Sequence, residues 1–196
     1  MPWIYENSLR LLAWSGLGLI ISTILTQVIT TIKDFKIQTR KEKAEEKLYL
    51  RKKDEERTAS SIACINMCIE LELFAERCAD ICADFDTYVD SGREYGRVYM
   101  NVPNTPDIKG QSDIAMLDPN IVNMALSLSY YVRRSNGKLE EFLKHTDDRE
   151  GVASTCASEA KILGAKALEI SNAARNEYAL PLREGDADWR VKHLLG

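Results

Sequence analysis

The chain has 196 residues, a formal net charge of −4 and 45% apolar residues. This length and composition suit one membrane span with one modest folded domain, and they exclude a polytopic membrane protein. The charge is uneven: residues 33–57 hold ten Lys/Arg against seven Asp/Glu, whereas residues 58–196 hold fifteen against twenty-two. The acidic remainder argues against nucleic-acid binding.

Residues 11–32, LLAWSGLGLIISTILTQVITTI, follow a short N-terminal tail (residues 1–10) and contain no charged side chain. As a helix this run is roughly 33 Å long, enough to cross a hydrocarbon core of about 30 Å. It predicts a transmembrane helix that places the chain in a lipid bilayer. A cleaved signal peptide is disfavoured, because Glu6 balances Arg10 and no small-residue cleavage pattern follows the run.

The basic residues flanking the run predict its orientation. The N-terminal side offers only Arg10, whereas five basic residues follow the run: Lys33, Lys36, Arg40, Lys41 and Lys43. Positively charged flanks stay on the cytoplasmic side. We therefore expect a single-pass protein of the cell inner (plasma) membrane, with its N-terminus outside and its C-terminal domain in the cytoplasm.

One face of the predicted span consists of small, weakly polar residues at helical spacing. These residues are Ser15, Gly18, Ser22, Thr26 and Thr30. Such a face allows two helices to approach closely in lipid, which predicts association through it. Alternatively, the hydroxyl groups bond the backbone of their own helix, as Ser and Thr commonly do in membrane spans.

Residues 33–57 form a highly charged segment without Pro or Gly, which predicts a solvated helical stalk continuing out of the membrane. A parallel coiled coil is an alternative, but a sustained repeat of apolar seam positions is missing. Nucleic-acid binding by the basic residues is a further alternative. A solvated, membrane-proximal surface explains the same pattern and is preferred.

Residues 58–90 predict the first helix of the folded domain. Apolar residues recur at steps of three and four along it: Cys64, Cys68, Leu71, Ala75, Cys78, Cys82, Phe85 and Val89, beside Met67, Phe74, Ile81 and Tyr88. The acidic residues between them predict a solvated face: Glu70, Glu72, Glu76, Asp80, Asp84 and Asp86. Ser91-Gly92 ends the helix.

An irregular loop is expected over residues 91–112, which Pro and Gly punctuate. Asp118-Pro119 predicts the start of a second helix to about Lys144, with a kink or break at Asn136-Gly137. A third helix follows from about Arg149 to Tyr178. The predicted fold is all-α: the transmembrane helix and stalk, then an antiparallel three- to four-helix bundle (residues 58–180) and a C-terminal tail (residues 181–196) with a short helix.

The cysteines form a twin C-x3-C pattern, Cys64 with Cys68 and Cys78 with Cys82. This motif alone resembles that of small mitochondrial intermembrane-space chaperones, in which two such pairs are cross-linked across a helical hairpin. Here no turn separates the two pairs, so they cannot fold back on each other. Burial as small apolar core residues is favoured over disulfides, and over a metal site, which usually has C-x2-C spacing.

We expect no catalytic, cofactor-binding or metal-binding residues. The two histidines, His145 and His193, lie near predicted chain breaks and far apart in sequence. No phosphate-binding loop, dinucleotide fingerprint, nucleophile elbow or zinc-protease motif is present. An enzyme that uses the bundle interior is a minor alternative.

The order of the span, the stalk KEKAEEKLYLRKKDEER and the Ala-rich helices resembles uncharacterised bacterial and phage-associated single-span membrane proteins. The resemblance implies a location and a fold, and no functional residues. The sequence therefore predicts a non-enzymatic protein-interaction module at the cytoplasmic membrane surface, which binds a protein partner or itself. The alternative is a phage-type envelope or lysis factor with a periplasmic helical domain.

Overall fold

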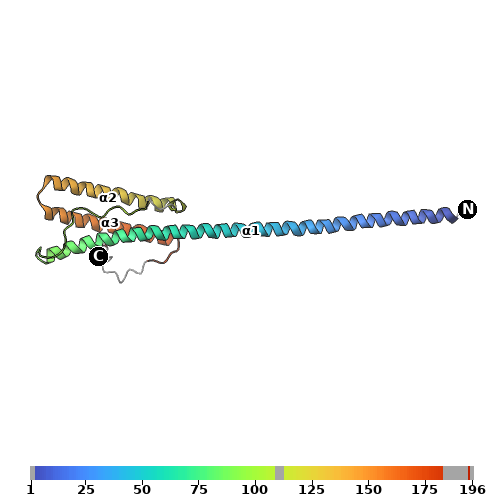
Figure 1. Ribbon diagram of the computed structural model, residues 1–196, viewed down its shortest axis with the longest axis horizontal. Helices are drawn as coiled ribbons and strands as arrows, with labels where there is room; N and C mark the ends of the chain where they lie inside the picture. Colours follow the sequence, from blue (N-terminus) through green and yellow to red (C-terminus); the bar gives the residue numbers. More distant parts are fainter. Residues whose placement is uncertain (1–2, 109–112, 183–193, 195–196) are drawn as a thin grey trace. The chain divides into compact units, whose positions relative to one another are not determined.

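The computed structural model describes residues 3–108, 113–182 and 194; for residues 3–22, 24 and 25 it describes the backbone only. Its regular elements are all helical: α1 (Trp3–Asp90), a 3-10 turn η1 (Ile114–Met116), α2 (Pro119–His145) and α3 (Arg149–Glu177), as Figure 1 shows. The predicted all-α class is confirmed for this part of the chain. By its contacts the chain divides into two compact units, Met1–Glu55 and Glu56–Gly196.

Helix α1 is long because nothing in its sequence interrupts it: no proline occurs between Pro2 and Pro103, and no glycine between Gly18 and Gly92. It ends where a Ser-Gly pair was expected to end it. Gly92 has a φ of +65°, its N–H donates to Val89 O (3.1 Å), and the N–H of Arg93 donates to Tyr88 O (2.8 Å). This pair of bonds is the Schellman motif, which needs a left-handed residue and therefore favours glycine.

One helix of the described residues is long and apolar enough to cross a membrane, namely α1 over Thr26–Asp90. Its most apolar 18 residues are 44% buried inside the structure. No residue from Thr26 to Ile62 is buried, so these 18 residues lie largely in the second unit, where α1 contributes to the core. The predicted span at residues 11–32 mostly precedes this stretch and stays a prediction.

Both shorter helices begin at an aspartate. Asp118 Oδ1 accepts hydrogen bonds from Asn120 N (2.8 Å) and Ile121 N (3.4 Å), and Asp148 Oδ1 accepts one from Gly151 N (2.9 Å). These carboxylates satisfy N–H groups that have no partner inside the helix, and they lie at its positive end. Both helix starts therefore follow from local sequence.

The contacts between α1 and α3 fix their relative direction. The thiol of Cys68 bonds Ser171 O (3.6 Å), and the thiol of Cys82 bonds Ala157 O (3.4 Å). From Cys68 to Cys82 along α1, the contacted residue on α3 thus moves back from Ser171 to Ala157. The two helices are therefore antiparallel (Figure 1).

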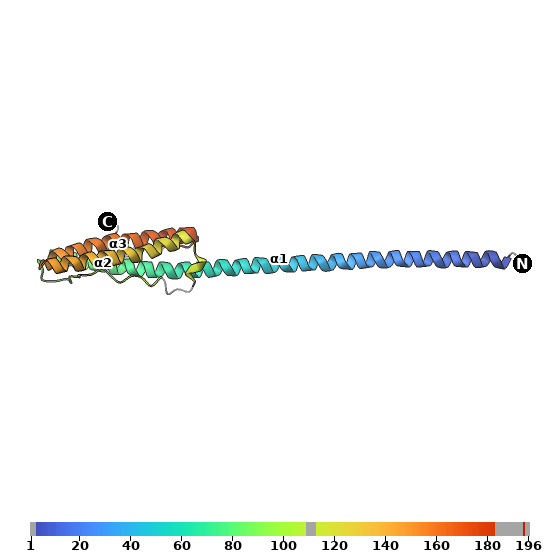
Figure 2. The same ribbon diagram turned by 90° about the horizontal axis from the view of Figure 1, so that it is seen from above.

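The contacts between α2 and α3 also run in opposite directions. Ser135 on α2 donates to Glu159 near the start of α3, and the hydroxyl of Tyr178 after α3 accepts from Asp118 N (2.7 Å). Because α3 opposes both other helices, α1 and α2 run in the same direction, as the two views show (Figures 1 and 2). The sequence predicted an antiparallel set, which holds for α3 but not for the pair α1 and α2.

The connection from α1 to α2 makes this parallel arrangement feasible. Its described residues run extended along the helices instead of turning back, and they bury Val102 and Ile108. Asn136 on α2 holds the connection: its Oδ1 accepts from Val102 N (2.9 Å) and its Nδ2 donates to Val102 O (3.4 Å). The kink or break expected at Asn136-Gly137 does not occur, because α2 continues through both residues.

One apolar core joins the three helices of the second unit. Helix α1 contributes the four cysteines of the twin C-x3-C pattern, together with Met67, Leu71 and Phe74. Helix α3 contributes mostly small residues that allow close packing. Leu194 is also buried; the short helix predicted near it lies outside the described residues. Val89, predicted to be part of the apolar stripe, is instead half exposed at the end of α1.

Candidate functional site: an exposed apolar face and a buried ion pair

Four large apolar side chains of α1 point away from the core of the second unit. They are Ile62, Ile65, Ile69 and Leu73, and they are 51%, 37%, 43% and 38% exposed, respectively. We call this set the α1 apolar face. The residues between them, such as Cys64, Met67 and Leu71, are fully buried on the other side of the helix. Helix α1 is thus apolar on two sides over this stretch, which is typical of a helix that packs against a second partner.

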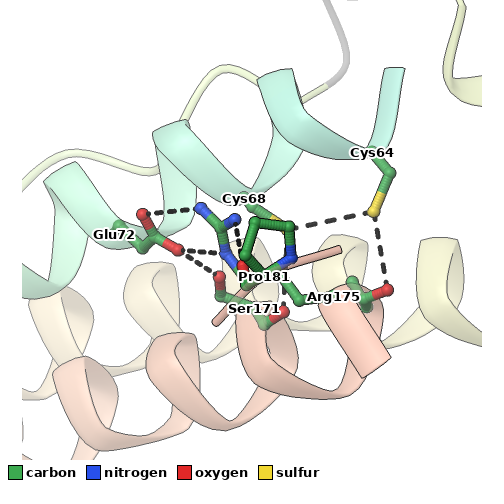
Figure 3. Close-up of polar contacts among 7 residues, drawn as sticks. Cys64, Cys68, Glu72, Ser171, Arg175 and Pro181 are labelled. Atoms are coloured by element: carbon green, nitrogen blue, oxygen red, sulfur yellow. Dashed lines mark hydrogen bonds and ion pairs between the residues drawn. The ribbon is translucent and has the colours of Figure 1, made fainter. Parts of the chain in front are cut away.

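The second feature is a buried ion pair between α1 and α3 (Figure 3). Arg175 Nε donates to Glu72 Oε1 (2.8 Å) and Nη2 donates to Glu72 Oε2 (3.2 Å). The side chains of Arg175 and Glu72 are only 11% and 8% exposed. Ser171 Oγ also donates to Glu72 Oε1 (2.7 Å), and Arg175 Nη1 donates to Pro181 O (3.0 Å).

The burial of Glu72 corrects the sequence analysis, which assigned it to a solvated acidic face. A carboxylate leaves water only if other groups replace its hydration, and here Arg175 and Ser171 do so. Glu72 in turn raises the pKa of Arg175 through their hydrogen bonds. The fork-shaped guanidinium matches the carboxylate in one geometry, so the pair holds α1 and α3 in a fixed register.

Two thiols lie beside this ion pair (Figure 3). The sulfur atoms of Cys64 and Cys68 are 3.9 Å apart, and Cys64 Sγ donates to Ala174 O (3.6 Å). The hydrogen bond between the two thiols lowers the pKa of Cys68 to about 7 and raises that of Cys64. The positive charge of Arg175 favours the thiolate form of both.

All five cysteines are buried and none forms a disulfide, which for Cys64, Cys68, Cys78 and Cys82 confirms their predicted packing in the core. Burial is the main cause that raises the pKa of Cys78, of Cys82 and of Cys156, the last to about 12. A buried neutral thiol is a poor nucleophile. These three thiols therefore act as small apolar side chains.

The raised pKa of Cys156 predicts how stability changes with pH. Below about pH 9 its thiol is protonated in the folded and unfolded states, and its full contribution to stability is present. As the pH rises from about 9 to about 12, only the unfolded state ionises, so the free energy of unfolding falls by up to about 1.4 kcal/mol per pH unit.

On going from pH 8 to pH 10, the free energy of unfolding of Cys156→Ala should therefore fall by about 1 kcal/mol less than that of the wild type. Denaturant unfolding at the two pH values would measure this difference. Ser154→Ala, at an exposed position of the same helix, serves as the control and should keep the wild-type pH dependence. Equal pH dependence in Cys156→Ala and the wild type would contradict this result.

The predicted transmembrane association face is described in part. Ser15, Gly18 and Ser22 lie in helical backbone of α1, and their side chains lie outside the described residues. Thr26 and Thr30 are exposed, and Thr30 Oγ1 donates to Thr26 O (2.8 Å). Thr30 thus bonds the backbone of its own helix, which is the alternative given for this face.

Metal ligands and histidines add no further site in the described part of the chain. No group of three or more His, Cys, Asp or Glu is arranged there to hold a metal ion. His145 is exposed at the C-terminal end of α2. His193 lies outside the described residues.

No protein-family model, curated protein or solved structure matches this chain. The resemblance to bacterial and phage-associated single-span proteins therefore gains no support from these comparisons and stays a prediction.

Proposed function

We propose that this protein is a single-pass, non-enzymatic interaction module that holds a helical bundle at the cytoplasmic surface of the inner membrane. Residues 11–32 supply the anchor: they carry no charge, and α1 runs through them without a break. The basic residues that follow favour the cytoplasmic side for residues 56–196. Helix α3 then packs antiparallel to both α1 and α2 as a three-helix bundle.

The cysteines support a cytoplasmic location for the bundle. All five are buried in one core and none forms a disulfide. Free thiols persist in a reducing compartment, whereas an oxidising one favours disulfides. In a periplasmic envelope or lysis factor, the five thiols would be in an oxidising compartment that favours disulfides.

The single observation that carries the interaction role is the α1 apolar face. Its three isoleucines and one leucine lie on a rigid helix and are 37–51% exposed. Contiguous exposed apolar side chains on a folded surface mark a place where another molecule binds. A helix face with anchors at steps of three and four residues suits packing against a helical partner.

The membrane span offers a second contact in this proposal. The small residues Ser15, Gly18, Ser22, Thr26 and Thr30 would let another span approach closely within the bilayer. Association in lipid and association through the α1 apolar face would then reinforce each other by raising the effective concentration. The lipid bilayer and a protein are therefore the proposed partners, and nucleic acid is not.

The side of the membrane on which the C-terminus lies tests this proposal. A reporter active only in the cytoplasm, and separately one active only outside it, would be fused after Gly196. We expect activity from the cytoplasmic reporter alone, and recovery of the chain in the membrane fraction after alkaline washing.

A matched control replaces the basic residues Lys33, Lys36 and Arg40 with glutamine. Weakening the positive flank in this way should shift part of the reporter signal to the outside. Activity of the outside reporter in the wild type would overturn the proposal and favour the envelope or lysis factor. Recovery of the chain in the soluble fraction would overturn the anchor.

A further inference from the structure

We propose that the molecule that covers the α1 apolar face is a second copy of this chain, packed parallel through residues 58–73 of α1. This inference depends on the proposed function, because the membrane anchor makes the two helices parallel. Copies anchored in one bilayer by the same N-terminal run enter the cytoplasm in the same direction. Equivalent residues of the two α1 helices are then the same number of residues from the anchor.

The spacing of the face fits a helix seam of this kind. Ile62, Ile65 and Ile69 follow each other at steps of three and four residues, the repeat of the apolar positions in a coiled coil. All three are on the side of α1 that faces away from α2 and α3, since the intervening core residues are fully buried. In a parallel pair, each isoleucine would meet its own counterpart.

The charge pattern favours a second copy of this chain over a different protein as the partner. Residues 51–57, RKKDEER, are all charged, whereas residues 58–69, TASSIACINMCI, contain no charge. A face built for a different protein usually carries charges that complement that partner and exclude others. Identical copies bring equal charges together, so an uncharged stretch is what self-association through this face needs.

The flanking residues mark where this contact would end. Up to Ile69 the positions beside the isoleucines are small or uncharged, such as Ala59, Ser61 and Asn66, and the first charged residue is Glu70. Beyond Leu73, Glu76 and Arg77 would each meet their own copy, and like charges in direct opposition are unfavourable. The contact is therefore confined to about four helical turns from Thr58 to Leu73.

Energy transfer between full-length chains in membranes tests the inference. Two populations, with donor or acceptor fluorescent proteins fused after Gly196, would be co-expressed and the transfer measured in isolated membranes. We expect transfer between wild-type chains above that of an unrelated single-span protein at the same density. Ile69→Glu should weaken the association roughly tenfold or more, because a carboxylate would be buried opposite its own copy.

Two controls separate this contact from other causes. Ile162→Glu makes the same change at a 64% exposed isoleucine on α3, outside the face, and should leave the transfer unchanged. Co-expression of Ile69→Glu chains with Ile69→Lys chains should restore it, because opposite charges then meet at one position. Only direct contact between the two copies of residue 69 predicts this rescue. Circular dichroism would show that each variant keeps the wild-type helical content.

Three results would overturn the inference: no transfer between wild-type chains, unchanged transfer in Ile69→Glu, or no rescue by the Glu/Lys mixture. The first would also be the outcome if lipid or another protein covers the face. Fractionation of the same cells separates this failure from failure of the proposed function. Chains that are in the membrane with a cytoplasmic C-terminus, yet show no transfer, refute only the second copy.

Discussion

Replacing Arg175 with methionine is expected to reduce the free energy of unfolding by about 3–5 kcal/mol, the usual effect of breaking a buried ion pair. The substitution removes both bonds from the guanidinium to the buried carboxylate of Glu72, while the bond from Ser171 Oγ (2.7 Å) stays. It also removes the bond to Pro181 O, which holds the chain after α3. Denaturant unfolding of the detergent-solubilised chain, followed by circular dichroism, would measure the loss.

The partner variants show whether the unpaired charge causes this loss. The double variant Glu72→Met with Arg175→Met removes both charges and should recover most of the lost stability, because apolar residues of similar volume can replace a buried pair. Arg175→Lys keeps the charge but loses the fork-shaped pairing, and should fall between the wild type and Arg175→Met. A double variant as unstable as Arg175→Met alone would contradict the assignment.

Replacing Gly164 with alanine is the second substitution with a large expected effect. A Cβ atom at Gly164 would lie 2.8 Å from Leu194 Cδ1 and 2.9 Å from Cys78 Cβ, closer than carbon atoms pack. Either Leu194 leaves its position or α1 moves away from α3. Overpacking of this kind reduces stability by about 1–3 kcal/mol, which thermal unfolding would detect.

The matched control is Gly137→Ala in α2. A Cβ atom at Gly137 meets nothing within 4 Å, so this change should add up to about 1 kcal/mol through helix propensity. The double variant Gly164→Ala with Leu194→Ala should be less unstable than the sum of its single changes, since it relieves one of the two close contacts. Equal responses at Gly164 and Gly137 would show that Gly164 is not in a packed contact.

Local features of the sequence predicted the helices well. Asp118 caps α2 and Gly92 ends α1 as expected, and Asp148 caps α3 in the same way, because each acts on backbone groups within five residues. The burial of the four cysteines of α1 also followed from their spacing along one stripe. These predictions needed no knowledge of the partners across the core.

Features that depend on distant residues could not be predicted in this way. Glu72 has the spacing of a surface residue, and only Arg175, 103 positions later, makes its burial favourable. The relative direction of α1 and α2 depends on where the connection packs, and Asn136 stabilises this packing by bonding the backbone of Val102. The α1 apolar face was missed because residues 62–73 are apolar on two sides of the helix. Sequence spacing alone does not tell its exposed residues from the buried core residues.

The long separation in sequence between α1 and α3 has a consequence for folding during synthesis on the ribosome. The core face of α1 is synthesised well before its partner: Ala174, which accepts the bond from Cys64, follows 110 residues later. At about 5–20 residues per second, this interval is roughly 5–20 s. During that time Met67, Leu71 and Phe74 have no α3 to cover them. During this interval a chaperone, or another nascent copy, can bind the uncovered core surface of α1.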